Sequence, residues 1–201
     1  MSRGRSEGYP LRRRDVVARL LEDRRDLLVI AGLGAPCWDV TAAGDQPLNF
    51  PLWGAMGSAV MIGLGLALAQ PARRVLVVTG DGEILMGLGA LATVAVQAPR
   101  NLAIVVLDNE RYGETGMQAT HTAHGTDLAA VAAAAGIPGT ETVADDAALE
   151  AAIPAIRGAD GPIFVNIKVK AEELALVLPP KDGAYLKDRF RAALMGDKAA
   201  L

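Results

Sequence analysis

The chain has 201 residues, of which 51% are apolar and 21% charged, and its formal charge at pH 7 is −3. That length suits one domain with a full hydrophobic core, and the slightly acidic balance excludes a general nucleic-acid binder, which needs a basic surface. We expect a single domain over residues 1–201, with its core at about 11–170 and a C-terminal tail at 171–201.

The N-terminus is basic but lacks the apolar run of a secretory signal. We interpret its arginines as a solvated tail that leads into a helix, not as a nucleic-acid arm. They are Arg3, Arg5, Arg12, Arg13 and Arg14. The single cysteine, Cys37, lies in a Gly/Pro-rich turn and fits a reducing compartment. The longest apolar stretch, 60–69, is too short to span a bilayer. We therefore expect a cytoplasmic protein that binds neither nucleic acid nor a membrane.

Apolar runs of strand length alternate with Ala-rich helical patterns along the chain. In chain order these predict a helix at 11–22, a strand at 27–31, a helix at 57–70, a strand at 75–78, a helix at 84–97, a strand at 102–107, helices at 128–135 and 146–157, and a strand at 163–169. Continuous β-branched runs indicate strands buried on both faces. The predicted fold is therefore α/β, a doubly wound, mostly parallel sheet with helices on both faces.

Two segments break this alternation. Residues 109–125 form a long polar stretch after the third strand, where ligands bind in sheets of this kind. The tail contains a Pro-Pro pair and then an amphipathic stretch that predicts a helix at 184–195. This helix either covers an edge of its own domain or contacts a partner.

The segment Gly80-Asp81-Gly82 stands between a predicted strand and a predicted helix. The glycines let the backbone come close to a ligand, and the start of the helix favours an anion such as phosphate. Asp81 would repel a phosphate unless a cation lies between them, and Mg²⁺ is the usual bridging ion. A helix-capping aspartate is the alternative. Asp108 and Asn109 follow the next strand, at the same edge of the sheet, so oxygen side chains of Asp81 and Asn109 converge on one site.

This arrangement resembles the thiamine-diphosphate motif of 2-oxoacid decarboxylases and acetolactate synthase-like enzymes. The resemblance implies that Asp81, Asn109 and the main-chain carbonyl of Arg111 bind Mg²⁺. Asp108 stands where the family usually has a first Asn. Upstream, Gly54-Ala55-Met56-Gly57 is similar to the family's Gly-x-Met-Gly segment. By that resemblance Met56 supports the bent thiamine, and the Gly54 carbonyl accepts a hydrogen bond from the 4′-amino group.

The run from Leu107 to Gln118 looks most like that of phosphonopyruvate and sulfopyruvate decarboxylases. This resemblance implies a set of residues that bind the cofactor: Gly54, Met56, Gly80, Asp81, Gly82, Glu83, Asn109, Arg111, Tyr112 and Gly113. The sequence departs from the family at 32–39, where Gly-Leu-Gly-Ala-Pro-Cys-Trp-Asp replaces a Thr/Ser-rich turn on the phosphate side. The departure affects the substrate prediction and leaves the cofactor prediction unchanged.

The family's catalytic glutamate, which contacts N1′ of the pyrimidine ring, sits on a separate pyrimidine-binding domain for which this chain has no room. The resemblance therefore implies a second subunit that carries this domain, in a hetero-oligomer with at least two copies of each chain. Three residues of the 109–125 segment are candidates for proton transfer to a reaction intermediate: Glu114, Gln118 and His121. A surface role is the alternative, and His124 has no assigned role.

The function that the resemblance implies is non-oxidative decarboxylation of a small anionic 2-oxoacid, such as a sulfonate or phosphonate, with thiamine diphosphate and Mg²⁺ as cofactors. A carboligase subunit and a non-catalytic thiamine-diphosphate-binding subunit are the alternatives. A dinucleotide-binding domain fits less well, because the turn that begins at Gly32 lacks the third glycine of Gly-x-Gly-x-x-Gly.

Overall fold

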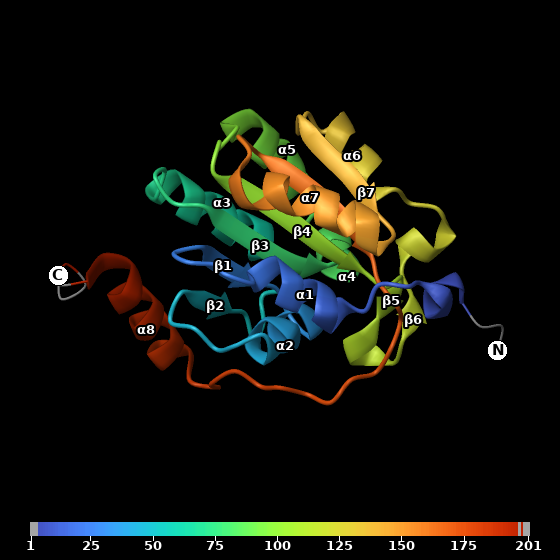
Figure 1. Ribbon diagram of the computed structural model, residues 1–201, viewed down its shortest axis with the longest axis horizontal. Coiled ribbons are helices and arrows are strands. Elements are labelled where there is room, and N and C mark those ends of the chain that lie inside the picture. The colour runs from blue at the N-terminus through green and yellow to red at the C-terminus, as the bar shows by residue number, and fades with distance from the viewer. Residues whose placement is uncertain (1–3, 197, 199–201) are drawn as a thin grey trace.

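The computed structural model describes residues 4–196 and 198, and its centre is a six-stranded sheet (Figure 1). The strand order is β2-β1-β3-β4-β8-β7, and every neighbouring pair is parallel. The strands are β1 (Leu28–Ala31), β2 (Asn49–Pro51), β3 (Val75–Gly80), β4 (Leu102–Asp108), β7 (Gly139–Val143) and β8 (Ile163–Lys168). The predicted α/β class is confirmed, and the four predicted strands are β1, β3, β4 and β8.

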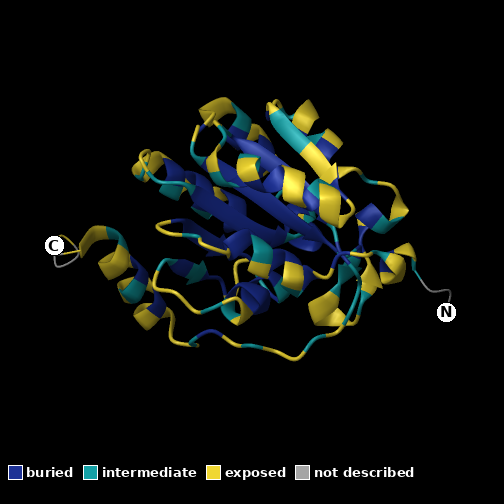
Figure 2. Ribbon diagram, viewed as in Figure 1, coloured by how far each residue is buried: buried dark blue, intermediate teal, exposed yellow. Residues whose placement is uncertain are grey.

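Helices cover both faces of the sheet. One face packs against α1 (Arg13–Leu21), α2 (Ala35–Ala42) and α7 (Asp146–Gly158), and the other against α3 (Ala59–Ala69), α4 (Asp81–Met86), α5 (Gly89–Gln97) and α6 (Leu128–Ala134). Successive residues of β1 face opposite layers, so Val29 joins the first core and Ile30 the second. Figure 2 shows the buried sheet between the partly exposed helices. None of the helices in the described residues is both long and apolar enough to cross a membrane.

The predicted continuous helix at 84–97 is wrong, because the structure ends α4 at Met86 and begins α5 at Gly89. A Cβ at Gly87 would lie 2.4 Å from the main-chain oxygen of Gly57. The loop before α3 therefore approaches so closely that the helical path is interrupted at a residue without a side chain.

The interpretation of residues 32–39 as a turn also needs correction. The turn is short, and α2 begins at Ala35 with a proline in its first turn, where a missing N–H costs least. Cys37 is consequently buried inside α2, and burial raises the pKa of its thiol to about 12.

The N-terminal arginines do not form a solvated tail. Arg5 pairs with the buried Glu110, and Arg12 pairs with Glu172 in the tail. Arg13 and Arg14, in the first turn of α1, both pair with Asp39 of α2. Arg3 lies outside the described residues. The four described arginines hold the N-terminal segment against the domain.

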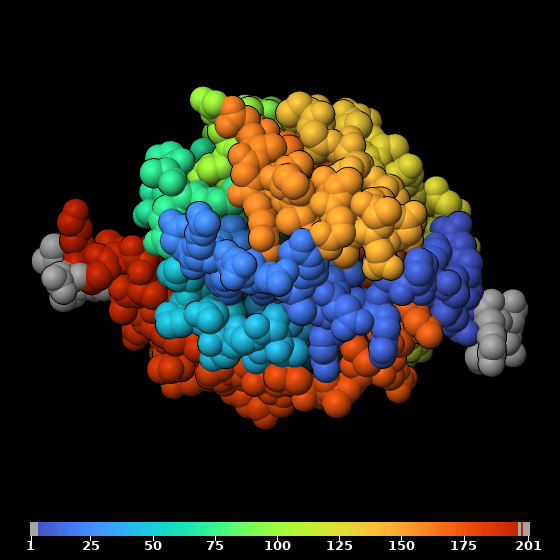
Figure 3. All heavy atoms as spheres, in the orientation of Figure 1, coloured from blue at the N-terminus to red at the C-terminus, as the bar shows by residue number. Residues whose placement is uncertain are grey.

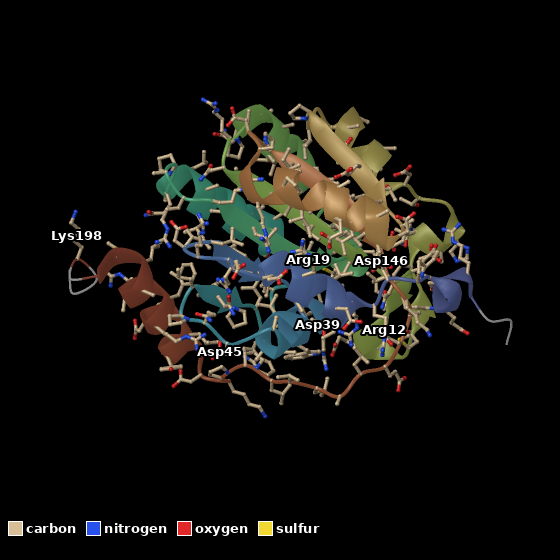
Figure 4. The ribbon with its side chains drawn as sticks, in the orientation of Figure 1. Arg12, Arg19, Asp39, Asp45, Asp146 and Lys198 are labelled. Atoms are coloured by element: carbon tan, nitrogen blue, oxygen red, sulfur yellow. The ribbon has the colours of Figure 1, made fainter. Side chains whose placement is uncertain are left out.

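The tail returns across the molecule to the β2 edge of the sheet, as the orange and red segment in Figure 3 shows. Its helix, α8 (Gly183–Met195), packs Phe190 against Phe50 of β2, with ring centroids 5.3 Å apart. Arg189 forms an ion pair with Asp45, which is labelled in Figure 4. Of the two roles left open by the sequence, the structure shows the first: α8 covers an edge of its own domain.

Candidate functional site

A cavity of about 430 Å³ opens at the carboxyl ends of β3 and β4. All of the predicted cofactor-binding residues except Gly54 line it, together with Glu114. The lining residues are Arg13, Leu33, Ala35, Pro36, Met56, Gly80, Asp81, Gly82, Glu83, Met86, Leu107, Asn109, Arg111, Tyr112, Gly113, Glu114 and Thr115. Two further surface hollows, of about 570 and 610 Å³, contain none of the predicted site residues. The fold thus brings together segments that are far apart in sequence.

The turn from β3 into α4 forms the floor of this cavity. Gly80 ends β3 and Asp81 begins α4. A Cβ at Gly82 would lie 2.7 Å from Cε1 of Tyr112 and 3.5 Å from Cε of Met56. Only glycine lets the Tyr112 ring approach the turn this closely, which explains the second glycine of the motif, whereas Met56 lies at an ordinary contact distance.

Asp81 is a buried carboxylate without a cationic partner among the described residues. It is 2% exposed, and its Oδ2 accepts hydrogen bonds from Thr120 Oγ1 at 2.5 Å and Thr122 Oγ1 at 3.3 Å. Burial, and then repulsion from the Asp108 carboxylate, raise the pKa of Asp81 above its ordinary range. A divalent cation in the cavity would supply the missing positive charge, so the side chain fits a metal ligand.

Asp108 lies beneath the site rather than in it. Its Oδ2 accepts hydrogen bonds from Lys168 Nζ at 2.6 Å and Asn166 Nδ2 at 3.0 Å, and its Oδ1 accepts one from Thr122 Oγ1 at 2.8 Å. Lys168 therefore compensates the charge that an aspartate adds at this position. The substitution leaves Asn109 at the cavity wall.

Asn109 and Arg111 are joined by a tight local turn. The main-chain N–H of Arg111 donates to Asn109 Oδ1 at 2.9 Å, and the residue between them, Glu110, has a φ of 62°. Both residues line the cavity with Asp81. The described residues contain no group of three or more His, Cys, Asp or Glu suited to a metal. The predicted set has a different composition, one carboxylate, one amide and one main-chain carbonyl, and such oxygen donors suit Mg²⁺.

Glu83 lines the cavity, but both of its carboxylate oxygens accept hydrogen bonds from other groups of the protein. Oε2 accepts from Thr79 Oγ1 at 2.7 Å and from the Leu33 N–H at 3.1 Å, while Oε1 accepts from the N–H groups of Gly57 and Ala59. Burial raises the pKa of Glu83. This side chain therefore ties the end of β3 to the loop after β1 and to the segment that leads into α3.

The remaining predicted residues separate into two groups. Glu114 lines the cavity and accepts a hydrogen bond from Trp38 Nε1 at 3.2 Å. His121 and Gln118 are exposed and lie outside the cavity lining, and Gln118 hydrogen-bonds Thr115 within its own turn. Gly54 is also exposed and outside the lining.

Four residues that contribute to the site were not predicted from the sequence: Thr120, Thr122, Lys168 and Arg13. The hydroxyls of Thr120 and Thr122 are 2.9 Å apart and connect Asp81 to Asp108. A Thr-x-Thr pair in a polar loop carries no signal by itself. The role of Lys168 could have been predicted, because it ends a buried strand, where a lysine needs an acidic partner.

The fold and the cavity define a class: an α/β domain that binds a cofactor at the carboxyl ends of its parallel strands. The family model "Thiamine pyrophosphate enzyme, C-terminal TPP binding domain" matches residues 35–167. The chain belongs to this family.

Two relatives and one solved structure are similar to the chain. The beta subunit of sulfopyruvate decarboxylase from Methanothermobacter thermautotrophicus is 41% identical over 186 residues, which cover 92% of this chain and 97% of that subunit. Phosphonopyruvate decarboxylase from Streptomyces viridochromogenes is 39% identical over 190 residues, 94% of this chain and 47% of that protein, so the chain spans about half of its length. The structure of benzoylformate decarboxylase from Polynucleobacter necessarius shares the fold, with a TM-score of 0.65 and 21% identity over 83% of this chain and 34% of that one.

Proposed function

We propose that the chain is the thiamine-diphosphate- and Mg²⁺-binding subunit of a heteromeric, cytoplasmic decarboxylase of a small anionic 2-oxoacid similar to sulfopyruvate or phosphonopyruvate. The observation that carries the proposal is the cavity, where nine of the ten predicted cofactor residues meet around the uncompensated Asp81 carboxylate. The similarity to a sulfopyruvate decarboxylase beta subunit over nearly its full length supports the substrate class.

Each residue has a defined part in this proposal. Asp81, Asn109 and the Arg111 carbonyl hold Mg²⁺ against the diphosphate. Met56 and Tyr112, which meet over Gly82, support the thiamine rings. When bound, thiamine diphosphate supplies a ring that accepts the electrons released with CO₂. The protein contributes the position of that ring and the apolar side chains of Leu33, Met56 and Leu107 in the cavity lining.

A partner subunit completes the site in this proposal and carries the glutamate that contacts the pyrimidine ring. The exposed surface next to the cavity supports such a partner, because it is apolar. At the cavity itself this surface is Met86, which is 66% exposed. Further exposed apolar side chains, Met61 and Leu68 of α3 and Val96 of α5, lie on the helices of the same face but outside the cavity lining. Apolar surface of this kind marks contact sites.

The test measures CO₂ release from sulfopyruvate and phosphonopyruvate by the chain alone, by a pyrimidine-domain subunit alone, and by the mixture, with thiamine diphosphate and Mg²⁺ present. We expect turnover only in the mixture, and its loss when the partner's glutamate is replaced by Gln. Robust turnover by this chain alone would contradict the two-subunit proposal. An added acceptor aldehyde that is converted to a ligated product would identify a carboligase instead.

A further inference from the structure

Arg13 lines the cavity, but the proposed function assigns no role to it. It is 5% exposed, it stands in the first turn of α1, and it lines the same cavity as Asp81. Its Nη1 lies 3.5 Å from the carbonyl oxygen of Ala35, at the start of α2. A buried guanidinium in a ligand cavity is costly unless anions compensate it.

The protein's own carboxylates neutralise the positive charge of Arg13 only in part. Arg13 pairs with Asp39, which projects from α2 beside α1 (Figure 4), but Arg14 pairs with the same carboxylate at 3.0 Å. Two guanidinium groups therefore share one carboxylate, and the group carries one net positive charge, because arginine keeps its proton in proteins. Arg14 also donates to the Ala175 carbonyl in the tail and does not line the cavity.

The other basic residue of the cavity, Arg111, is directed elsewhere. A Cβ at Gly4 would lie 1.8 Å from Nη2 of Arg111, so this guanidinium lies against the N-terminal segment. Of the basic residues that the structure describes in the cavity lining, Arg13 is consequently the one that remains for an anion.

Contacts place Arg13 at one end of the cavity. Met56 and Tyr112 meet at Gly82, while a Cβ at Gly80 would approach Pro36 at 4.0 Å. Pro36 follows Ala35, the residue whose carbonyl Arg13 contacts. A thiamine ring held over Met56 would leave the Gly80 and Pro36 end of the cavity for the diphosphate. The turn there, residues 32–36, offers no hydroxyl or charged side chain, and its proline lacks an N–H.

We propose that Arg13 is an anion-binding residue of this site and donates hydrogen bonds to a phosphate group of the cofactor, in place of the side-chain donors that the 32–36 turn lacks. This inference rests on the proposed thiamine-diphosphate site. It assigns the shared Asp39 carboxylate the task of orienting the guanidinium, with Arg14 completing the charge balance.

The test compares three probes, thiamine diphosphate, inorganic pyrophosphate and thiamine, each titrated calorimetrically in the presence of Mg²⁺. The protein is the full chain, with the partner subunit where the two co-purify. In Arg13→Met the dissociation constants of both diphosphate probes should rise at least about tenfold, the lower range for a lost hydrogen bond to a charged group, while that of thiamine stays unchanged. Arg13→Lys should restore part of the loss.

Arg12→Met is the control, because it removes a neighbouring guanidinium that pairs with Glu172 and does not line the cavity, and its affinity for thiamine diphosphate should stay close to wild type. If Arg13→Met fails to fold, the Arg13→Met/Asp39→Asn double variant removes the buried carboxylate together with its buried partner and should show the same loss. Unchanged diphosphate affinity in either variant, or an equal loss for thiamine, overturns the inference. A wild-type protein that does not bind thiamine diphosphate would instead refute the proposed function.

Discussion

The environment of the Asp81 side chain agrees with the metal ion proposed for this site. Its carboxylate is buried, accepts side-chain hydrogen bonds from the neutral hydroxyls of Thr120 and Thr122, and faces the repulsion of Asp108. A capping aspartate stands at the N-cap and accepts hydrogen bonds from main-chain N–H groups of the first turn, whereas the N-cap of α4 is Gly80 and no side chain of the described residues caps this helix. The combination agrees with the proposed metal and not with a helix cap.

We predict that Asp81→Ala weakens thiamine diphosphate binding by a factor of about ten or more, on the order of 1.4 kcal/mol, because the Mg²⁺ loses its anionic ligand. Calorimetric titration with and without Mg²⁺ measures the effect. Without the metal, wild type and variant should bind with similar, weak affinity. Equal affinity of the folded variant in the presence of Mg²⁺ would remove Asp81 from the metal site.

Met56 provides a second prediction at this scale. If it supports a bent cofactor, Met56→Leu keeps most of the volume and should retain more activity than Met56→Ala, which opens space. The assay is CO₂ release by the mixed subunits, with thermal unfolding as the control. The side chain is half-buried at the cavity, so the midpoints should differ little. Full activity of the alanine variant would make Met56 an ordinary packing residue.

At the scale of elements, the strands in the middle of the sheet could be predicted and its edges could not. The strands β1, β3, β4 and β8 are buried on both faces and therefore read as continuous apolar runs. Edge strand β2 has three residues, one of them proline, and edge strand β7 reads Gly-Thr-Glu-Thr-Val. Both lack an apolar run, because an edge strand is only partly covered.

Some residues of the candidate site could likewise be predicted from the sequence, and others could not. Asp81 and Asn109 were predictable because each follows a strand directly, at positions fixed by the sheet. The contributions of Thr120, Thr122 and Arg13 depend on the path of a long loop and on the docking of α1 against α2. Such tertiary contacts leave no periodic pattern in the sequence.

The α8 helix supports a prediction about stability. Phe190 is buried against Phe50, so Phe190→Ala should lower the free energy of unfolding by about 3 kcal/mol, the lower range for removal of a buried phenylalanine. Lys187→Ala, whose exposed side chain pairs only with the adjacent Asp188 among the described residues, is the control and should change little. Urea unfolding measures both. Equal stability of the two variants would mean that α8 does not hold the β2 edge.

At the scale of the whole molecule, the proposed partner and the tail act on different surfaces. The tail and α8 occupy the β2 edge, whereas the exposed apolar residues of α3 and α5 and the cavity residue Met86 remain uncovered. Binding of a partner over the cavity therefore does not require displacement of α8. We expect the Phe190→Ala variant to form the two-subunit complex with normal stoichiometry, as size-exclusion chromatography with light scattering would show. Loss of the complex would place α8 in the subunit interface.

The strand order has a consequence for synthesis on the ribosome. The sheet pairs Ala103 of β4 with Ile163 of β8, so one side of a fully buried central strand has no neighbour until sixty more residues have been translated. A nascent chain in that state exposes an open sheet edge, which invites pairing with other chains. A protein truncated after residue 158 should therefore aggregate, while one truncated after residue 170 keeps β8 and should stay soluble; the soluble fraction after expression distinguishes them. A soluble, monomeric 158-residue product would show that β4 is protected before β8 arrives. In cells, a premature stop between the two strands should therefore yield an aggregating fragment, because β4 never gains its neighbour β8.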